Sequence, residues 1–221
     1  KMVILDADNP EIEDFIHWKA IEEKKVADLY TGSRINSKWL NKIMKVAHEQ
    51  KTTDWKQNKE LRRVILKALS RDVPYVYVTR SLKLVEQGKT SIDFPVYDTH
   101  YEGEAYITVS GQNSNNSVRI PNKFMSAVRN NQNWNLTARS NGSILKTINA
   151  RELWDKIAYA AWSSADPGLQ FDDHINEWHT CPVDGKIYGT NPCSEYIFLN
   201  DTACNLASIN LMKFLDEQTG K

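Results

Sequence analysis

The residues best suited to chemistry lie together near the C-terminal end of the chain, in the sequence Asn191-Pro192-Cys193-Ser194-Glu195. Pro192 disfavours the helical conformation for Asn191, so we expect these five residues to be extended. Alternate side chains of an extended segment point the same way, which would place Asn191, Cys193 and Glu195 in one row. The row offers an amide, a thiol and a carboxylate to a polyhydroxylated ligand, with Glu195 as candidate base and Cys193 as reactive sulfur.

Two further cysteines flank this segment. Cys204 follows Cys193 by eleven positions, and Cys181 precedes it in the sequence Trp-His-Thr-Cys-Pro. Cys193 and Cys204 could be a redox pair, metal ligands or two core residues. Zinc is the weakest of these interpretations, because no CxxC or paired-histidine motif completes a ligand set, and we expect no metal. An isolated Asn-Pro-Cys-Ser-Glu sequence is equally consistent with a structural cysteine in a turn.

The composition limits the class of protein. The chain has 221 residues, 41% of them apolar, which can supply the core of one large domain. Lys+Arg and Asp+Glu number 28 each, so we expect no basic surface and no nucleic-acid partner. No apolar run approaches the roughly 18 to 20 residues that span a bilayer, so we expect no membrane segment. Three cysteines without a CxxC pair fit a reducing cytoplasm.

Both ends of the chain lack the usual signs of a natural terminus. A strand-like run, Met2–Leu5, follows the first residue at once, and residues 211–215 start an element just before the sequence stops. We therefore interpret the chain as an internal fragment.

Periodicity and turn residues predict alternating strands and helices, which is typical of an α/β fold. We predict helices from Asn9-Pro10 to about Tyr30, where Thr31-Gly32-Ser33 ends the first, and at 39–47, 61–69, 121–129, 149–166 and 169–178. We predict strands at 2–6, 73–79, 105–109 and 117–120, and a hairpin of 134–138 with 143–147. Residues 179–208 are rich in Cys, Pro, Gly, Asn and Ser, which predicts a loop region followed by a strand.

The segment from Thr190 to Leu211, TNPCSEYIFLNDTACNLASINL, closely resembles the active-site loop and following strand of ribonucleotide reductase large (catalytic) subunits. Four other segments resemble the adenosylcobalamin-dependent class of that family: residues 2–16, GQNSNNSVR at 111–119, ADPGLQF at 165–171 and WHTCP at 178–182. The likeness covers most of the chain apart from about residues 35–101.

The resemblance implies a fold. Members of the family have a ten-stranded α/β barrel of two half-barrels, with the active-site cysteine on a finger loop that runs through its centre. Residues 1–221 would then be part of this catalytic barrel domain, and residues 35–101 a possible peripheral insertion.

The resemblance also implies roles for single residues. Cys193 matches the cysteine that becomes a thiyl radical and abstracts the 3′ hydrogen of the ribose, and Glu195 matches the carboxylate that takes the 3′-hydroxyl proton. Asn191 matches the amide that orients the substrate, and Asn191, Pro192, Cys193, Ser194 and Glu195 together would line the substrate site. Cys204 matches one of two cysteines that reduce the substrate and end as a disulfide; its partner would lie before Lys1. Cys181 does not match that partner and is interpreted as a structural thiol.

The implied activity is reduction of ribonucleotides to 2′-deoxyribonucleotides for DNA synthesis, as in ribonucleoside-diphosphate reductases, although triphosphate substrates stay open. Adenosylcobalamin would supply the radical, because no ordinary side chain generates one unaided. A thioredoxin-like reductant, nucleotide effectors bound outside this fragment and a homodimeric parent are implied as well, and the fragment alone would be inactive. Two alternatives are the same reaction with a separate di-iron radical subunit, and a nucleotide-binding module without catalysis.

Overall fold

The computed structural model describes residues 1–216 and 218–220. The chain divides into two compact units, which we call the sheet unit (Lys1–Ile16, Ser114–Ala161 and Ala165–Lys221) and the helical unit (His17–Asn113 and Trp162–Ser164). Both strands and helices are present, so the predicted mixed α/β class is confirmed. No helix among the described residues is both long and apolar enough to cross a membrane.

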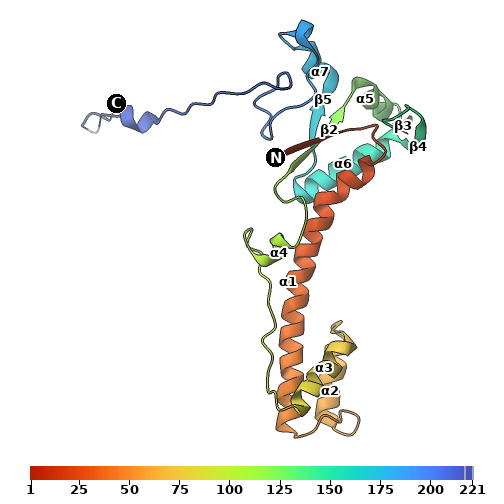
Figure 1. Ribbon diagram of the computed structural model, residues 1–221, viewed down its shortest axis with the longest axis vertical. Coiled ribbons are helices and arrows are strands. Elements are labelled where there is room, and N and C mark those ends of the chain that lie inside the picture. The colour runs from red at the N-terminus through yellow and green to blue at the C-terminus, as the bar shows by residue number, and fades with distance from the viewer. Residues whose placement is uncertain (217, 221) are drawn as a thin grey trace. The chain divides into compact units, whose positions relative to one another are not determined.

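The sheet unit is built on three parallel strands (Figure 1). Strand β2 (Asn115–Ile120) lies between β1 (Met2–Asp6) and β5 (Gly168–Phe171). In the register of the sheet, Asp6 is opposite Arg119 and Arg119 is opposite Gln170. The predicted strands at 2–6 and 117–120 are confirmed.

The two faces of this sheet differ in chemistry because successive side chains of a strand point to opposite sides. Val118 and Ile120 join a buried apolar cluster that also contains residues of α5 (Asn122–Arg129) and α6 (Ala150–Ser164). Arg119 and Gln170 alternate with the apolar positions and are buried polar residues. We call the side that carries these two residues the polar face of the sheet.

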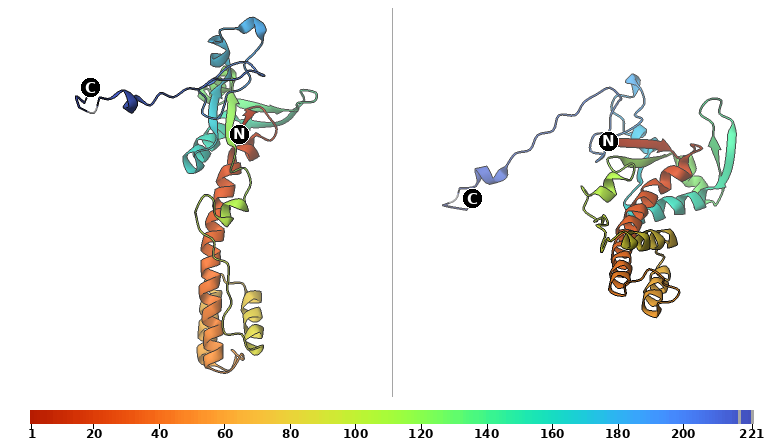
Figure 2. Two further views of the ribbon diagram at one scale, coloured as in Figure 1. Left: turned by 60° about the vertical axis from the view of Figure 1, so that its left-hand side comes forward. Right: turned by 60° about the horizontal axis from the view of Figure 1, so that its bottom comes forward.

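A separate antiparallel hairpin joins α5 to α6 (Figure 2). It consists of β3 (Asn133–Thr137) and β4 (Ile144–Asn149), as the sequence predicts. Asn149 caps α6, because its side-chain oxygen accepts hydrogen bonds from the backbone N–H groups of Arg151 and Glu152. Helices α5 and α6 confirm the helices predicted at 121–129 and 149–166 to within a few residues.

Two predictions in the sheet unit need correction. The helix predicted at 169–178 is present but shorter: the first residues pair with β2 as part of β5, and the acidic pair at 172–173 then starts the helix α7 (Asp172–Glu177). The strand predicted after the loop is not formed by the described residues, which give short 3₁₀ helices at Pro182–Asp184 (η1) and Leu211–Phe214 (η2). A strand needs a partner for its backbone groups, and none of the described residues pairs with 202–210.

Helix α1 (Ile12–Glu49) runs without a break through Gly32, so the predicted end at Thr31-Gly32-Ser33 and the separate helix at 39–47 are wrong. Glycine inside a helix costs only about 1 kcal/mol relative to alanine. Each buried aliphatic side chain on the helix, such as Leu40 or Ile43, contributes about 1.5 to 3 kcal/mol. The apolar side chains therefore outweigh the local cost of Gly32.

The helical unit has its own core, formed where α2 (Lys59–Leu69) and α3 (Tyr75–Glu86) pack beside the C-terminal half of α1 (Figure 1). Helix α2 is as predicted. The strand predicted at 73–79 is wrong: β-branched and aromatic residues favour strands only weakly, and here Pro74 precedes the first helical turn while Val78 and Leu82 are buried at helical spacing. The strand predicted at 105–109 is wrong as well, since Glu104–Ile107 forms a short helix, α4, with Ala105 buried.

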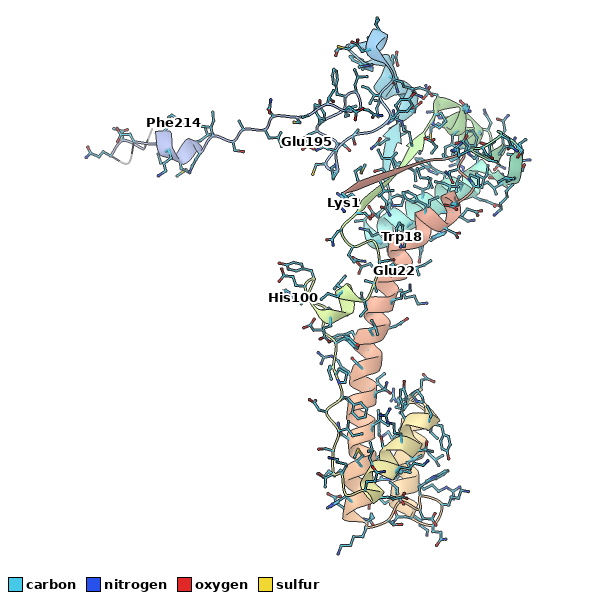
Figure 3. All side chains as sticks on the ribbon, viewed as in Figure 1. Lys1, Trp18, Glu22, His100, Glu195 and Phe214 are labelled. Carbon is cyan, nitrogen blue, oxygen red and sulfur yellow. The ribbon has the colours of Figure 1, made fainter. Side chains whose placement is uncertain are left out.

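The segment before β2 is attached to α1 inside the helical unit. Trp18 and Glu22 lie one turn apart on α1 (Figure 3). The Trp18 indole N–H donates to Ser110 Oγ at 2.9 Å, and the Ser110 backbone N–H donates to Glu22 Oε2 at 2.9 Å. Hydrogen bonds from Lys25 and from the Ser110 backbone hold the pKa of Glu22 below its ordinary value, so this buried carboxylate stays ionised.

Candidate functional site

Cys193 lies in a tight turn rather than in an extended segment. The Ser194 backbone N–H donates to the Asn191 carbonyl at 3.0 Å, which makes Pro192 and Cys193 the two central residues of a β-turn. The predicted extended pentapeptide is therefore wrong. The ring of Pro192 fixes a backbone angle that suits the second position of such a turn, and Ser194 takes a positive φ of 61°.

The flanking residues close this turn into a small loop. Thr190 and Ile197 form an antiparallel bridge. Asn191 donates its backbone N–H to the Tyr196 carbonyl at 3.3 Å and accepts from the Tyr196 N–H on its side-chain oxygen at 3.0 Å. The predicted row of Asn191, Cys193 and Glu195 on one face is not formed, because the Asn191 side chain closes the loop instead.

The reactive groups themselves are open to solvent. Cys193, Glu195 and Cys204 are exposed, and Glu195 directly follows the turn (Figure 3). Cys204 lies in the segment 202–210, which has no helix or strand, and no disulfide links any of the three cysteines among the described residues. The structure thus brings Asn191, Cys193 and Glu195 into one loop and leaves Cys204 outside it.

Cys181 is half-buried beside His179. The Cys181 backbone N–H donates to His179 Nδ1 at 3.4 Å, and the His179 ring meets Phe198 edge-on with ring centroids 5.7 Å apart. These contacts pack the His179 ring, and the Cys181 sulfur lies 4.0 Å from the Thr180 hydroxyl. Among the described residues, no group of three or more His, Cys, Asp and Glu side chains is arranged to hold a metal ion.

The loop that carries Cys193 rests on the polar face of the sheet. We call residues 185–197 the cysteine loop. It meets β2 where Arg119 Nη2 donates to the Ile187 carbonyl at 2.5 Å. It meets β1 at Gly189, where an added Cβ would lie 2.7 Å from Ile4 Cδ1. The third contact, with β5, is a hydrogen bond of 2.9 Å from Gln170 Nε2 to Thr190 Oγ1.

A buried ion pair lies under this loop. Arg119, 3% exposed, donates from Nε to Asp172 Oδ1 at 2.6 Å, and Lys186 donates to the other carboxylate oxygen at 2.7 Å. Burial raises the pKa of Asp172, but the hydrogen bonds from Lys186 and Arg119 outweigh it and hold the pKa below its ordinary value of 3.8. Asp172 therefore stays ionised at neutral pH and neutralises the Arg119 guanidinium.

The residues that support the cysteine loop were not predicted from the sequence as site residues; they are Arg119, Gln170, Asp172 and Thr190. One signal was available: Arg119 stands between Val118 and Ile120 in a strand short enough to be wholly buried, and a buried arginine needs partners for its charge. The partners themselves come from two other segments, β5 with α7 and the cysteine loop, and no local pattern connects those segments to β2.

Of two hollows in the protein, one borders the cysteine turn and the other does not. One of about 340 Å³ lies beside the cysteine turn and is bordered by Gln170, Trp178, Thr190, Ser194 and Ile197, among others. A cavity of about 910 Å³ lies in the helical unit between α1, α3 and residues 92–109, and its lining includes none of the predicted site residues. The hollow beside the cysteine turn is therefore the one that belongs to the candidate site.

The adenosylcobalamin that the resemblance implies would have to reach the residue that receives the radical. Cys193 meets this requirement, because it is an exposed thiol on a loop that rests on buried polar residues. We assign none of the described residues to the binding of the corrin ring.

Residues 1–221 match the family described as ribonucleotide reductase, barrel domain. The vitamin B12-dependent ribonucleotide reductase of Agrobacterium fabrum is 53% identical over 224 residues, which cover 99% of this chain and 18% of that protein. The protein of the same name from Streptomyces avermitilis is 37% identical, over 98% of this chain and 16% of its own length.

A third relative matches a shorter part. The vitamin B12-dependent ribonucleoside-diphosphate reductase of Thermoplasma acidophilum is 42% identical over 103 residues, which cover 47% of this chain and 13% of that protein. The chain thus spans less than a fifth of the length of the Agrobacterium and Streptomyces relatives. A match over residues 1–221, together with identity of 53% across nearly the whole chain, shows that this chain belongs to the ribonucleotide reductase barrel domain family.

Proposed function

We propose that the chain is the radical-cysteine segment of a vitamin B12-dependent ribonucleotide reductase. The observation that carries this proposal is the exposed Cys193 at the centre of a turn that rests on a parallel sheet, in a chain of this family. The names of the relatives from Agrobacterium and Streptomyces support the class. The parent protein would reduce ribonucleotides to 2′-deoxyribonucleotides, and the chain alone would be inactive.

Three side chains would do the chemistry. Cys193, as a thiyl radical, takes the 3′ hydrogen of the ribose, which makes its S–H bond and leaves a carbon radical. Glu195, adjacent to the turn, accepts the 3′-hydroxyl proton and so helps the 2′ hydroxyl leave as water. Cys204 and a second thiol supply two electrons and two protons and end as a disulfide. Glu195 then returns its proton to the 3′ oxygen, and Cys193 returns the 3′ hydrogen, which regenerates the thiyl radical.

Asn191 would take part in substrate binding through the Nδ2 group of its side-chain amide, which the loop leaves available. Its oxygen closes the cysteine loop, and no described residue accepts from its Nδ2 group. Nδ2 can therefore donate to a substrate hydroxyl. Pro192 and Ser194 would belong to the same substrate site, and Ser194 borders the hollow of about 340 Å³.

The cofactor we assign is adenosylcobalamin. When bound, it supplies the radical that Cys193 receives, and this is the one part of the chemistry that no side chain of the chain can provide. The contribution of the chain is to present the Cys193 thiol in a fixed position.

The finer architecture we propose is part of a ten-stranded α/β barrel with the cysteine loop as its central finger. The three parallel strands support this, because one face packs on α5 and α6 while the polar face carries the cysteine loop. Residues 1–221 would form part of the catalytic barrel domain. The separate core of the helical unit supports residues 35–101 as a peripheral insertion.

The remaining assignments concern the whole protein. The name of the Thermoplasma relative supports a ribonucleoside diphosphate as substrate. A thioredoxin-like protein would re-reduce the disulfide, nucleotide effectors would bind outside this chain, and we propose a cytoplasmic homodimer.

The test uses the full-length protein under anaerobic conditions with a ribonucleoside diphosphate and a small dithiol. Deoxyribonucleotide formation should require both adenosylcobalamin and Cys193, and Cys193→Ala should abolish it. Cys181→Ala is the matched control and should retain activity, since Cys181 has no role in the proposed reaction. If activity needs Cys193 but not the cofactor, a separate subunit generates the radical. Activity that survives Cys193→Ala would overturn the proposal.

A further inference from the structure

The position of the cysteine turn can be traced back to Arg119. The guanidinium of this buried residue donates to three acceptors: Asp172 Oδ1 at 2.6 Å, Gln170 Oε1 at 3.0 Å and the Ile187 carbonyl at 2.5 Å. A guanidinium has only donors, so Gln170 has to turn its side-chain oxygen toward Arg119. The orientation of the Gln170 amide is therefore fixed by a charged neighbour on the adjacent strand.

That orientation determines what Gln170 offers to the cysteine loop. With its oxygen toward Arg119, its Nε2 group faces Thr190 and donates to Thr190 Oγ1 at 2.9 Å. Gln170 is 3% exposed, so water has little access to replace either bond. The Thr190 hydroxyl accepts this hydrogen bond and directs its own proton to the Asn191 carbonyl at 2.9 Å.

The Asn191 carbonyl is the oxygen that closes the turn. It accepts from the Thr190 hydroxyl and also from the Ser194 backbone N–H at 3.0 Å, and Pro192 and Cys193 lie between these two donors. A continuous series of hydrogen bonds thus runs from Arg119 on β2, through Gln170 on β5, to the turn that holds Cys193. Arg119 fixes the direction of the Gln170 amide, and Thr190 Oγ1, which accepts from that amide, also lies 3.3 Å from Ser194 Oγ at the end of the turn.

We infer that Gln170 and Thr190 are positioning residues for Cys193. They contact neither the thiol nor any reacting atom; they hold the turn at a fixed place above the sheet. This inference rests on the proposed function and adds to it the side chains that fix where the radical is held. A hydrogen transfer requires the two reacting atoms to be closely placed, and a displacement of about 1 Å can lower a rate about 100-fold.

Two substitutions remove the hydrogen bond that Gln170 donates to Thr190. Thr190→Val keeps the shape of the side chain and removes the hydroxyl. Gln170→Glu keeps an acceptor for Arg119 but, as a carboxylate, has no proton for Thr190, and the Thr190 hydroxyl can donate to it only by releasing the Asn191 carbonyl. Thr190→Ser restores the hydroxyl and is the matched rescue. All variants are made in the full-length protein, and circular dichroism checks that each is folded.

The inference predicts that Thr190→Val and Gln170→Glu each lower kcat about 10- to 100-fold while KM stays within about twofold, since a misplaced thiol slows the hydrogen transfer more than it weakens substrate binding. Thr190→Ser should recover most of kcat. The double variant should be no worse than Thr190→Val alone, because that variant already lacks the hydroxyl through which Gln170 acts on the turn.

The inference would be overturned if folded Thr190→Val kept the wild-type kcat, or if the losses of the two single variants multiplied in the double variant. If Gln170→Glu does not fold, Thr190→Val and Thr190→Ser decide the inference alone. Failure of the proposed function looks different. In that case Cys193→Ala itself keeps its activity. If Cys193→Ala is inactive and Thr190→Val is unaffected, only the positioning role is rejected.

Discussion

At the scale of single residues, Arg119 connects the stability of the sheet unit to the placement of Cys193. A charge that is only 3% exposed is tolerated because a carboxylate, a side-chain amide and a backbone carbonyl all accept from it. The same contacts join β2, β5 and the cysteine loop. Substitutions around Arg119 should therefore change local stability and loop position together.

Asp172→Asn should destabilise the strands β2 and β5 by about 3 kcal/mol, because it leaves the buried Arg119 charge without its counter-ion. Lys186→Met, on the outer side of the same carboxylate, should cost less than about 1 kcal/mol, since the Lys186 side chain is 46% exposed. Hydrogen exchange of the amides at 115–120 and 168–171 measures both effects. Equal losses in the two variants would contradict the special role of the buried pair.

The pKa of Asp172 gives these strands a defined dependence on pH. Since its pKa in the folded state is lowered from 3.8, the unfolded state binds more protons around that pH. The stabilisation is complete above pH 3.8 and is lost as the pH falls through the lower folded value. After correction for intrinsic exchange rates, protection of β2 and β5 should fall below about pH 4 in the wild type. Asp172→Asn should lack this step, and an identical step in the variant would assign it to other groups.

At the scale of elements, the sequence predicted those that are specified by local signals. The hairpin at 140–142, the Asn149 cap and the helix at 61–69 were found because turn residues, caps and periodicity all lie within the element itself. The elements that were missed depend on distant partners. Residues 73–79 have strand-forming side chains, yet Val78 and Leu82 are buried in the core of the helical unit and fix a helix. Residues 191–195 were predicted to be extended, yet bonds from Thr190 and Ser194 close a turn.

The effect of replacing a glycine by alanine depends on its backbone angle φ, and this can be tested at Gly32 and Gly88. A Cβ at either position would meet nothing within 4 Å, but Gly88 has a positive φ of 86° whereas Gly32 lies in helix α1. Gly32→Ala should stabilise the helical unit by about 0.5 to 1 kcal/mol. Gly88→Ala should destabilise it by about 1 to 2 kcal/mol. Thermal or denaturant unfolding of the full-length protein compares the two, and effects of the same sign would contradict the helical assignment at Gly32.

At the scale of the whole molecule, each of the two units has a core of its own. The family could be predicted from the sequence because the motifs of the cysteine loop are contiguous. The resemblance indicated residues 35–101 as a possible insertion, but the boundary between the units could not be predicted, because helix α1 contributes Ile12 and Ile16 to one cluster and Leu40 and Ile43 to the other without any break in its helical pattern. Only the packing of distant segments separates the two cores.

Matched core substitutions test whether the units are energetically separate. Leu61→Ala in the helical unit and Ile157→Ala in the sheet unit each empty a fully buried site and should cost about 2 to 5 kcal/mol locally. Leu61→Ala should lower hydrogen-exchange protection in α2 and α3 and leave β2 unchanged, with the reverse pattern for Ile157→Ala. Loss of protection throughout both units in either variant would argue against residues 35–101 as an insertion.

The most direct measurement of the central claim compares the reduction of a ribonucleotide carrying deuterium at its 3′ carbon with that of the ordinary substrate, using the full-length protein and adenosylcobalamin. If Cys193 removes the 3′ hydrogen, the deuterated substrate should react more slowly under conditions where this step limits the rate, and Cys193→Ala should not turn over either substrate. Equal rates for the two substrates, together with activity in Cys193→Ala, would contradict the account.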